Sequence, residues 1–505
     1  MLMNYKNRSK FMLILSLLLI SCATQNSSSS NSFNSSLNDI QYEKYNVLDK
    51  ARLSTLYNHY GTPILDSLGN QKILVLPIII KGYENNATDQ VLNDLNLAFF
   101  GKSEEVEYES VSSFYHKSSY GKLSISGKVS KWYNPNVTSE ELKSHASSTY
   151  DDGGLFWLID NALTWYQNEY NDIDDFDQNK DGYIDSIYLI YSAPNYYLDN
   201  SLSSFYWSFT YSHMENKDKK SDEKMGMRYS WSSYDAMYQG YGKDKIDAHT
   251  YIHEVGHLLG LSDYYDTGNS NVSPMGKVDM MDYDIGDHSS YSKFALGWIT
   301  PYIIDKPGTI TLKSSTYCGD FLIFKTEANN NTPFDEYIMM EFITPTGLNE
   351  KDYLNGYKKY WDETPIKGYD DVGVRITYID SRSVNINNEF TDNLDEMIGV
   401  KFSNTPRGNV EGFLSIEGQF YLLSTMIPKD CKYGNNGLSG ASFKAESKHL
   451  FKKGDQFDLR HDSQYRDMTP HRSNEYDKDK AGFFKYIVTI KDMNKEQCTI
   501  EFQTY

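Results

Sequence analysis

The chain has 505 residues, of which 39% are hydrophobic and 15% aromatic, enough to bury two or more cores of ordinary size. Its formal net charge is −20 and the sequence shows no basic patch, which argues against nucleic acid and against adsorption on anionic lipid. Length and composition agree with an exported globular protein. Four cysteines are too few for a disulfide scaffold.

The first 22 residues predict export and lipid anchoring. An apolar run at 11–20, too short to span a bilayer, follows three basic residues, Lys6, Arg8 and Lys10. The sequence Leu-Ile-Ser-Cys that ends at Cys22 resembles a bacterial lipobox. Residues 1–22 are therefore predicted to be a lipoprotein signal peptide, and Cys22 to become the lipidated N-terminus on the outer face of a bacterial cell membrane. A plain secretory signal cleaved at another site is the alternative.

Two short segments separate this signal from the first folded domain. The Ser- and Asn-rich residues 23–38 are predicted to be a flexible tether that lets a folded domain stand off the membrane. Residues 39–70 form a leader segment, and the pattern leaves open whether it inhibits the domain that follows or is removed. With Cys22 assigned to lipid, at most one disulfide is possible among the remaining cysteines, Cys318, Cys431 and Cys498.

Residues 71–301 are predicted to form an α/β (α+β) domain. The apolar, β-branched run at 72–80 is typical of a buried strand, and residues 183–191 alternate like a strand. Helical patterns occupy residues 86–101, 104–117, 155–170 and 247–259.

A cation-binding loop is predicted within residues 175–185 of this domain. Oxygen-bearing side chains alternate there and a glycine permits a sharp turn, which suits a hard cation such as Ca²⁺. The predicted ligands are Asp177, Asn179, Asp181 and Asp185. The twelfth position of an EF-hand loop would be Tyr188 rather than Glu, so the motif is incomplete. A solvated acidic turn is the alternative reading.

The string HEVGHLLGLSD, residues 253–263, predicts a zinc site. Positions i and i+4 share one helix face, so His253 and His257 can present their imidazoles to one ion, while Glu254 can reach a water beside it. Gly260 tolerates the left-handed backbone of a helix end, which lets the chain double back and bring Asp263 to the same ion. The alternative is a buried helix with satisfied histidines and a surface Glu.

Other candidates for the third ligand fit less well. In gluzincins a Glu from a following helix binds the metal, but the first Glu after Glu254 is Glu327, which lies beyond a Pro-Gly break in a β region. His288 is a competitor whose spacing fits no zincin pattern, and His249 lies one turn before His253 on the same face. Asp263 is therefore the predicted ligand.

Residues 302–505 are predicted to form a β-rich, β-sandwich-like C-terminal domain. Strand-like alternation with turn signals recurs at residues 309–315, 320–326, 335–343, 372–379 and 483–502. The last stretch is predicted to be two strands that each place three residues on one face, first Tyr486, Val488 and Ile490, then Cys498, Ile500 and Phe502.

Four stretches together resemble the M6 family of secreted bacterial metallopeptidases, the immune inhibitor A type. The chain reads HEVGHLLGLSDYYD at 253–266, VDMM at 278–281, SKFALGWITP at 292–301 and SYGKLSISGKV at 119–129. The corresponding family patterns are HExGHxLGLxDxYD, WDxM, SKxxLGWxxP and SYGKLxIxGxV. One departure is Val278, where the family has Trp. The family also has a DGDGxxD segment before a strand, which supports calcium at the acidic loop.

The resemblance implies a metzincin-like zinc endopeptidase that acts on extracellular or envelope proteins. Glu254 would act as the general base on a zinc-activated water, and Met281 would form an apolar floor beneath the histidines without binding zinc. The resemblance assigns His249 no ligand role. Some metzincins place a phenol near zinc through Met-x-Tyr, so Tyr283 is predicted to stabilise the oxyanion, with simple packing as the alternative. A surface-anchored binding or adhesion protein with an inactive zincin fold is the second functional hypothesis.

Overall fold

The part of the chain that can be described excludes most of the N-terminus. The computed structural model describes residues 42–45, 51–59, 64–146, 153–212, 225–226, 228–241, 245–266, 273–325, 329–387, 389–400, 403–404, 421–432, 443–459 and 484–505. The predicted signal peptide, Cys22 and the tether lie outside these residues and stay predictions. Within the described ranges, none of the helices has the length and apolar character needed to cross a membrane.

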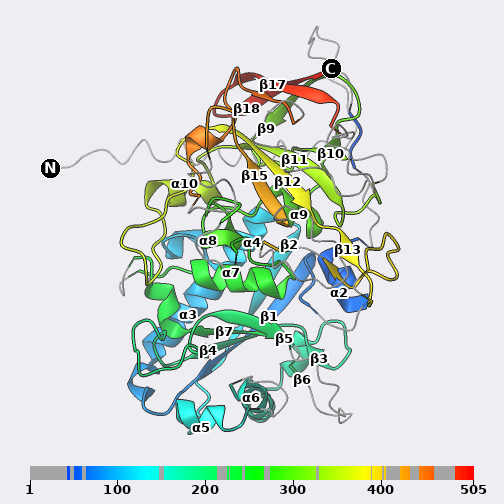
Figure 1. The fold of residues 1–505 in the computed structure, drawn as a ribbon. Helices are drawn as coiled ribbons and strands as arrows, with labels where there is room; N and C mark the ends of the chain where they lie inside the picture. The colour runs from blue at the N-terminus through cyan, green and yellow to red at the C-terminus, as the bar shows by residue number, and fades with distance from the viewer. Residues whose placement is uncertain are drawn as a thin grey trace, which may run out of the picture.

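A five-stranded sheet forms the centre of the N-terminal half (Figure 1). Its strand order is β2-β1-β4-β7-β5. The first four strands are parallel, and β5 is antiparallel to β7 at the edge. The strands are β1 Gly69–Ile78, β2 Leu123–Val129, β4 Ile187–Tyr191, β5 Phe209–Ser212 and β7 Arg228–Ser233.

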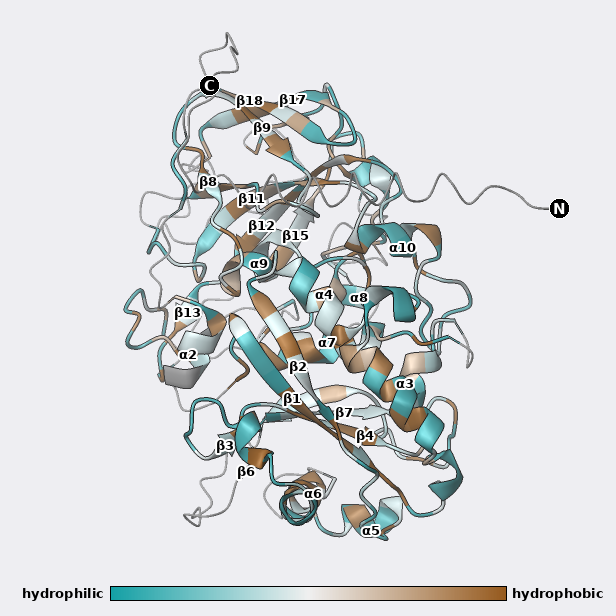
Figure 2. Cartoon of the chain, turned by 180° about the vertical axis from the view of Figure 1, so that it is seen from behind, coloured by the Kyte–Doolittle hydropathy of each residue, from teal (hydrophilic) through white to brown (hydrophobic). Residues whose placement is uncertain are grey.

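Helices cover both faces of this sheet, which explains why the second part of β1, from Ile73 to Ile78, is apolar. Ile73 and Val75 lie in the cluster that contains residues of α3, α4 and α7, whereas Leu74 and Leu76 lie in the cluster with α6 on the other face. Figure 2 shows β1 changing from hydrophilic to hydrophobic along its length. A strand buried on both faces reads as a continuous apolar run. The helices are α3 Asp89–Phe100, α4 Val111–Ser118, α5 Ser139–Lys143, α6 Leu155–Glu169 and α7 His249–Leu258.

The C-terminal half contains two further sheets that share one hydrophobic cluster. The first has the order β15-β12-β11-β10-β8, and the second, β16-β17-β18-β9, is antiparallel throughout. The strands are β8 Tyr302–Ile303, β9 Gly308–Lys313, β10 Phe321–Lys325, β11 Glu336–Ile343, β12 Gly373–Asp380, β15 Leu423–Met426, β16 Gln456–Phe457, β17 Tyr486–Met493 and β18 Gln497–Thr504. The six residues predicted to share the inner faces of β17 and β18 are all buried.

The two halves share part of their core. The main cluster contains Val255 of α7 together with Met339 of β11. Phe294, in α9 Ser290–Ala295, packs edge-to-face on Tyr337 of β11 with ring centroids 5.8 Å apart. The chain is thus a mixed α/β protein with several sheets, including an antiparallel C-terminal sheet, as the sequence pattern predicted at this coarse level.

Part of the predicted leader segment packs into this core. α2 Leu53–His59 buries Leu53 and Leu56, and the following Leu65 is fully buried. The Leu65 N–H donates to the carbonyl of Leu258 at the end of α7, with an N···O distance of 3.1 Å. This segment therefore supports the end of α7 as part of the fold.

Two predicted boundaries were wrong for identifiable reasons. The helix expected over 104–117 begins only at Val111, because the Ser110 hydroxyl caps it by accepting from the Ser113 N–H. The strand expected over 183–191 is divided into β3 Tyr183–Ile184 and β4. At the break, the Asp185 N–H turns to the carbonyl of Phe176.

Short elements complete the described chain. Near α7 these are α8 Met280–Tyr283 and α10 Leu348–Leu354. Small two-stranded sheets pair β3 with β6 Met225–Gly226, and β13 Ser383–Val384 with β14 Gly399–Val400. Single 3-10 turns lie at η1 Glu84–Asn86, η2 Ser103–Glu105, η3 Ile173–Phe176, η4 Tyr234–Tyr238 and η5 Ser447–His449.

Candidate metal centre

His253, Glu254 and His257 lie on α7, and the helix ends as its sequence predicted. Gly260 has a φ of +94°, in the left-handed region. The Leu261 N–H donates to the carbonyl of Gly256 at 3.0 Å, and the Gly260 N–H donates to that of His257 at 2.9 Å. These two hydrogen bonds form a Schellman turn, which reverses the chain directly after the helix.

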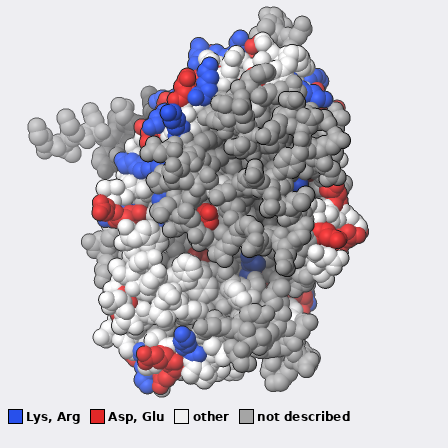
Figure 3. Space-filling model, viewed as in Figure 1, with Lys and Arg blue, Asp and Glu red and all other residues white. Residues whose placement is uncertain are grey.

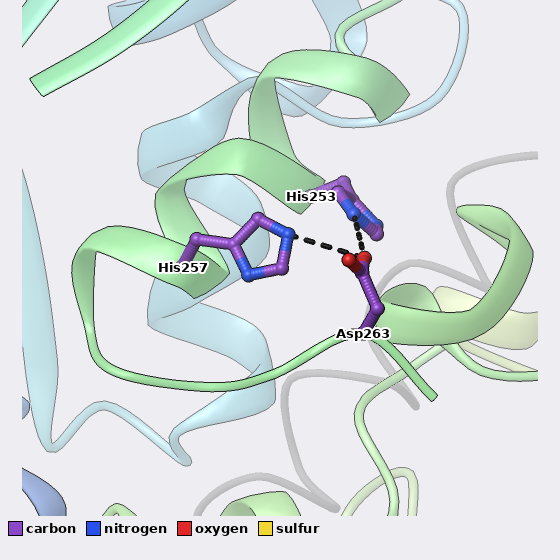
Figure 4. Close-up of side chains that lie close together, drawn as sticks. All are labelled: His253, His257 and Asp263. Carbon is purple, nitrogen blue, oxygen red and sulfur yellow. Dashed lines mark hydrogen bonds and ion pairs between the residues drawn. The ribbon is translucent and has the colours of Figure 1, made fainter. Parts of the chain in front are cut away.

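The reversal brings three side chains together (Figure 4). The Asp263 Oδ1 atom lies 3.1 Å from His253 Nε2 and 3.2 Å from His257 Nε2. Among the described residues, this is the one group of three or more His, Cys, Asp or Glu side chains whose potential ligand atoms all lie within 4.8 Å of one another. The three residues predicted as metal ligands are therefore neighbours.

The other nitrogen of each imidazole faces the protein. His253 Nδ1 lies 2.8 Å from the carbonyl oxygen of Met280, and His257 Nδ1 lies 2.8 Å from that of Leu261. A carbonyl oxygen only accepts hydrogen bonds, so each Nδ1 bears the proton and each Nε2 of a neutral ring keeps its lone pair for a cation. Histidine ligands of metals are commonly oriented in this way.

Asp284 is a charged neighbour of the site that the sequence did not reveal. Its Oδ1 atom lies 3.0 Å from His253 Nδ1 and 3.0 Å from the Lys359 ammonium. Burial opposes ionisation, but Lys359 and His253 outweigh it and hold the pKa of Asp284 at about 2. Its backbone is left-handed, with φ +60°, which turns the carboxylate back toward α7.

The electrostatics of the cluster favour positive charge between its members. Burial alone would raise the pKa of Asp263, but the two imidazoles outweigh it and hold that pKa well below its usual range. Burial lowers the pKa of His257, and the Asp263 carboxylate more than reverses this effect. A proton or a metal ion can supply the charge that stabilises this arrangement.

The donor set, two imidazole nitrogens and one carboxylate oxygen, suits a tetrahedral metal ion such as Zn²⁺, and the three atoms all lie within 4.8 Å of one another. Three protein ligands would leave one coordination position open, as in catalytic rather than structural zinc sites.

Glu254 is next to the cluster and almost fully buried, at 4% exposure. The Thr210 hydroxyl of β5 lies 2.9 Å from its Oε2 atom and orients the carboxyl group. Burial raises the pKa of Glu254, although His257 and His253 partly oppose the shift. A carboxyl group with a raised pKa beside a metal site is suited to accept and return a proton.

Met281 packs against α7 between the two histidine positions. A Cβ atom at Gly256 would lie 2.3 Å from the sulfur of Met281, well inside van der Waals contact. The Met281 carbonyl accepts a hydrogen bond from the Tyr264 N–H at 2.7 Å, so the turn also supports the segment that contains Asp263.

Among the described residues, no hydrogen bond joins Tyr283 to His253, His257 or Asp263. Its hydroxyl donates to Asp362 at 2.7 Å and accepts from the Trp361 indole N–H at 2.9 Å. Tyr265 is closer to the ligands. Burial, together with the charges of Asp263 and Glu254, raises the pKa of Tyr265 well above its usual value.

The two competing histidines have different surroundings. His288 is 1% exposed, and neither of its ring nitrogens has a hydrogen-bond partner among the described residues. Burial and the nearby Lys293 ammonium hold its pKa well below the usual value, so the ring is neutral. His249 lies between two carboxylates, Asp247 and Asp352.

Three of the predicted calcium ligands, Asp177, Asn179 and Asp181, lie in a tight turn between η3 and β3, and the fourth, Asp185, directly follows β3. Asp177 accepts from the N–H groups of Asp181 and Gly182 at 3.1 and 3.0 Å, and Asp181 accepts from the Tyr183 N–H at 2.8 Å. Asp185 accepts from the Gln178 N–H at 2.8 Å. Burial, together with the charges of Asp181 and Asp177, raises the pKa of Asp185 to about 6.

Comparison with known proteins adds no family assignment. No protein-family model matches the chain, and none of the curated proteins compared with it is similar. The site is thus defined by its own residues and geometry.

The first prediction tests the contact between α7 and Met281. Gly256→Ala should lower the free energy of unfolding by about 1–2 kcal/mol, because overpacking against a fully buried methionine outweighs the gain in helix propensity. Chemical denaturation measures the change. Gly399→Ala is the matched control, since no atom lies within 4 Å of a Cβ there. Equal stability of the two variants would contradict the close packing.

Proposed function

We propose that the protein is a zinc-dependent endopeptidase that hydrolyses extracellular or envelope proteins. The observation that supports this most is the placement of three ligand atoms around one point, with both Nδ1 atoms turned to backbone carbonyls and a buried glutamate beside them. A site for metal alone has no need of Glu254.

His253, His257 and Asp263 would hold the zinc ion. Bound zinc would lower the pKa of a water molecule to about 7 and polarise a peptide carbonyl. Glu254 would take the proton from the attacking water on a carboxylate oxygen and deliver it to the leaving amine. The Thr210 hydroxyl would keep that carboxyl group oriented between these two transfers.

The proposal includes the finer features of the fold and location. We infer a metzincin-like catalytic domain in the M6 style, followed by a β-sandwich-like region, with Met281 as the methionine of the turn. The lipid on Cys22 would anchor the enzyme to the outer face of a bacterial cell membrane. The proposed substrates are proteins or peptides. On the face drawn in Figure 3, acidic and basic side chains lie near one another toward the rim.

The alternative is a surface-anchored binding or adhesion protein with an inactive zincin fold. The buried, oriented Glu254 favours the enzyme, because a binding protein gains nothing from a carboxyl group whose burial raises its pKa. Wild-type protein that binds zinc and leaves casein and gelatin intact would favour the alternative.

The test of the mechanism separates the base from the ligands. Glu254→Gln should lower casein hydrolysis by at least about a hundredfold while one zinc ion stays bound, because the general base is not a metal ligand. His257→Ala should lose both zinc and activity.

Glu104→Gln is the matched surface control for this experiment, since its side chain is exposed. A chelator should abolish wild-type activity, and added zinc should restore it. Substantial hydrolysis by the Glu254 variant would overturn the mechanism.

A pair of tyrosine variants tests the proposal for Tyr283. Oxyanion stabilisation requires that its hydroxyl leave Asp362 and Trp361 when substrate binds. Tyr283→Phe should then lower kcat by about a hundredfold and leave zinc bound. Tyr265→Phe removes a hydroxyl whose pKa is raised by the Asp263 carboxylate, so it should lower zinc affinity rather than kcat. An unchanged kcat for Tyr283→Phe would assign this residue to packing.

Calcium at the acidic turn remains part of the proposal. A divalent cation would relieve the repulsion between Asp177, Asp181 and Asp185 that contributes to the raised pKa of Asp185. Asp181→Ala should lower Tm and remove its dependence on added calcium, with zinc content unchanged. Asp174→Ala, an exposed position just outside the turn, is the control. A wild-type Tm that is indifferent to calcium would contradict the site.

A further inference from the structure

A buried charged cluster lies one helical turn before the first metal ligand. His249 is 0% exposed. Its Nδ1 atom contacts Asp247 Oδ1, and its Nε2 atom lies 3.0 Å from Asp352 Oδ1. The ring is stacked between those of Tyr108 and Tyr357, with centroid distances of 3.9 and 4.3 Å.

This geometry requires a doubly protonated ring. An ionised carboxylate only accepts hydrogen bonds, and a neutral imidazole can donate only one. His249 faces a carboxylate from each nitrogen, so both nitrogens must bear protons. Burial opposes the charge, but Asp247 and Asp352 outweigh it and raise the pKa of His249 to about 10.

The cluster connects α7 to the turn that contacts the metal ligands. Asp352, on α10, uses its other carboxylate oxygen to accept the N–H of Gly286. Two residues earlier, Asp284 lies 3.0 Å from His253 Nδ1. The Tyr108 hydroxyl lies 3.2 Å from the carbonyl oxygen of Gly286, so the ring that covers His249 also contacts this turn.

We propose that His249 is a positioning residue for the metal centre: it fixes α7 to α10 and to the turn at Gly286, and so holds Asp284 against His253. This role rests on the proposed metal site. It does not make His249 a ligand, because both ring nitrogens are already occupied. The interaction is long-range, since Asp352 lies 103 positions away in the sequence.

The charge on His249 gives the cluster a pH dependence. The folded pKa of about 10 lies above the ordinary value of 6.5. The stabilisation is therefore complete below about pH 6.5 and is lost as the pH rises toward about 10. The other ionisable groups that face the cluster are Asp247, Asp352, Tyr108, Tyr357, Tyr241 and Lys351.

The test compares His249→Gln, which cannot become charged, with His116→Gln, an exposed histidine on α4. Both proteins are measured as purified, full-length chains. The His249 variant should have a lower Tm than wild type at about pH 6, and the difference should shrink by at least half at about pH 9.5. The His116 variant should follow wild type at both values. A difference that does not change with pH would overturn the charged cluster.

Metal binding then separates positioning from general stability. His249→Gln should bind zinc about 10- to 100-fold more weakly and should alter the visible spectrum of the cobalt-substituted protein, because the support of His253 is weakened. An unchanged zinc affinity and cobalt spectrum, with only Tm lowered, would reduce His249 to a structural role and overturn the proposal.

A second variant covers the case in which His249→Gln does not fold. Asp352→Asn keeps an acceptor for the Gly286 N–H and removes the negative charge of residue 352 that stabilises protonated His249. The pKa of His249 should then fall, so the pH range in which stability is lost should move to lower pH. An unmoved range would overturn the role of Asp352. If the wild-type protein binds no zinc, both the proposed function and the positioning role of His249 are overturned. The comparison of Tm at the two pH values does not depend on zinc and tests the charged cluster by itself.

Discussion

The candidate metal centre depends on how α7 ends. The left-handed Gly260 and the two hydrogen bonds of the Schellman turn reverse the chain within three residues of His257. The same reversal directs the Leu261 carbonyl to His257 Nδ1 and places Asp263 against both Nε2 atoms. One local turn thus sets the orientation of one ligand and the position of another.

Elements distant in sequence hold this local arrangement in place. Arg228 of β7 donates to the carbonyl of His257, and Leu65 donates to that of Leu258. The Met280 carbonyl orients His253, and Thr210 of β5 orients Glu254. In a buried site such hydrogen bonds are strong and costly to break, so the surrounding fold fixes the angles that the motif alone leaves free.

The sequence predicted what is periodic or local. The apolar run of β1, the helix α7 with its glycine end, and the alternation of β17 and β18 were all confirmed. The three predicted ligands, separated by at most ten positions, lie together.

Long-range partners could not be predicted in this way. Asp284 contacts His253 through a left-handed turn and depends on Lys359, 75 positions away. Spacing placed the Tyr283 phenol near the metal, whereas in the structure its hydroxyl bonds to Asp362, 79 positions away. No periodic pattern marks either contact, because each depends on which loops the tertiary fold brings together.

The buried histidines show which physical property distinguishes a ligand from its neighbours. The Nδ1 atoms of His253 and His257 lie against carbonyl oxygens, and that of His253 also lies 3.0 Å from Asp284. In a neutral ring this leaves the lone pair of Nε2 for a cation. His249 faces carboxylates from both nitrogens, so protons occupy both positions. His288 has no polar partner among the described residues and stays neutral. Sequence spacing cannot distinguish these environments, since His249 shares its helix face with His253. The Nε2 atoms of His253 and His257 converge on one oxygen of Asp263, whereas Nε2 of His249 faces Asp352, and the tertiary fold sets these partners.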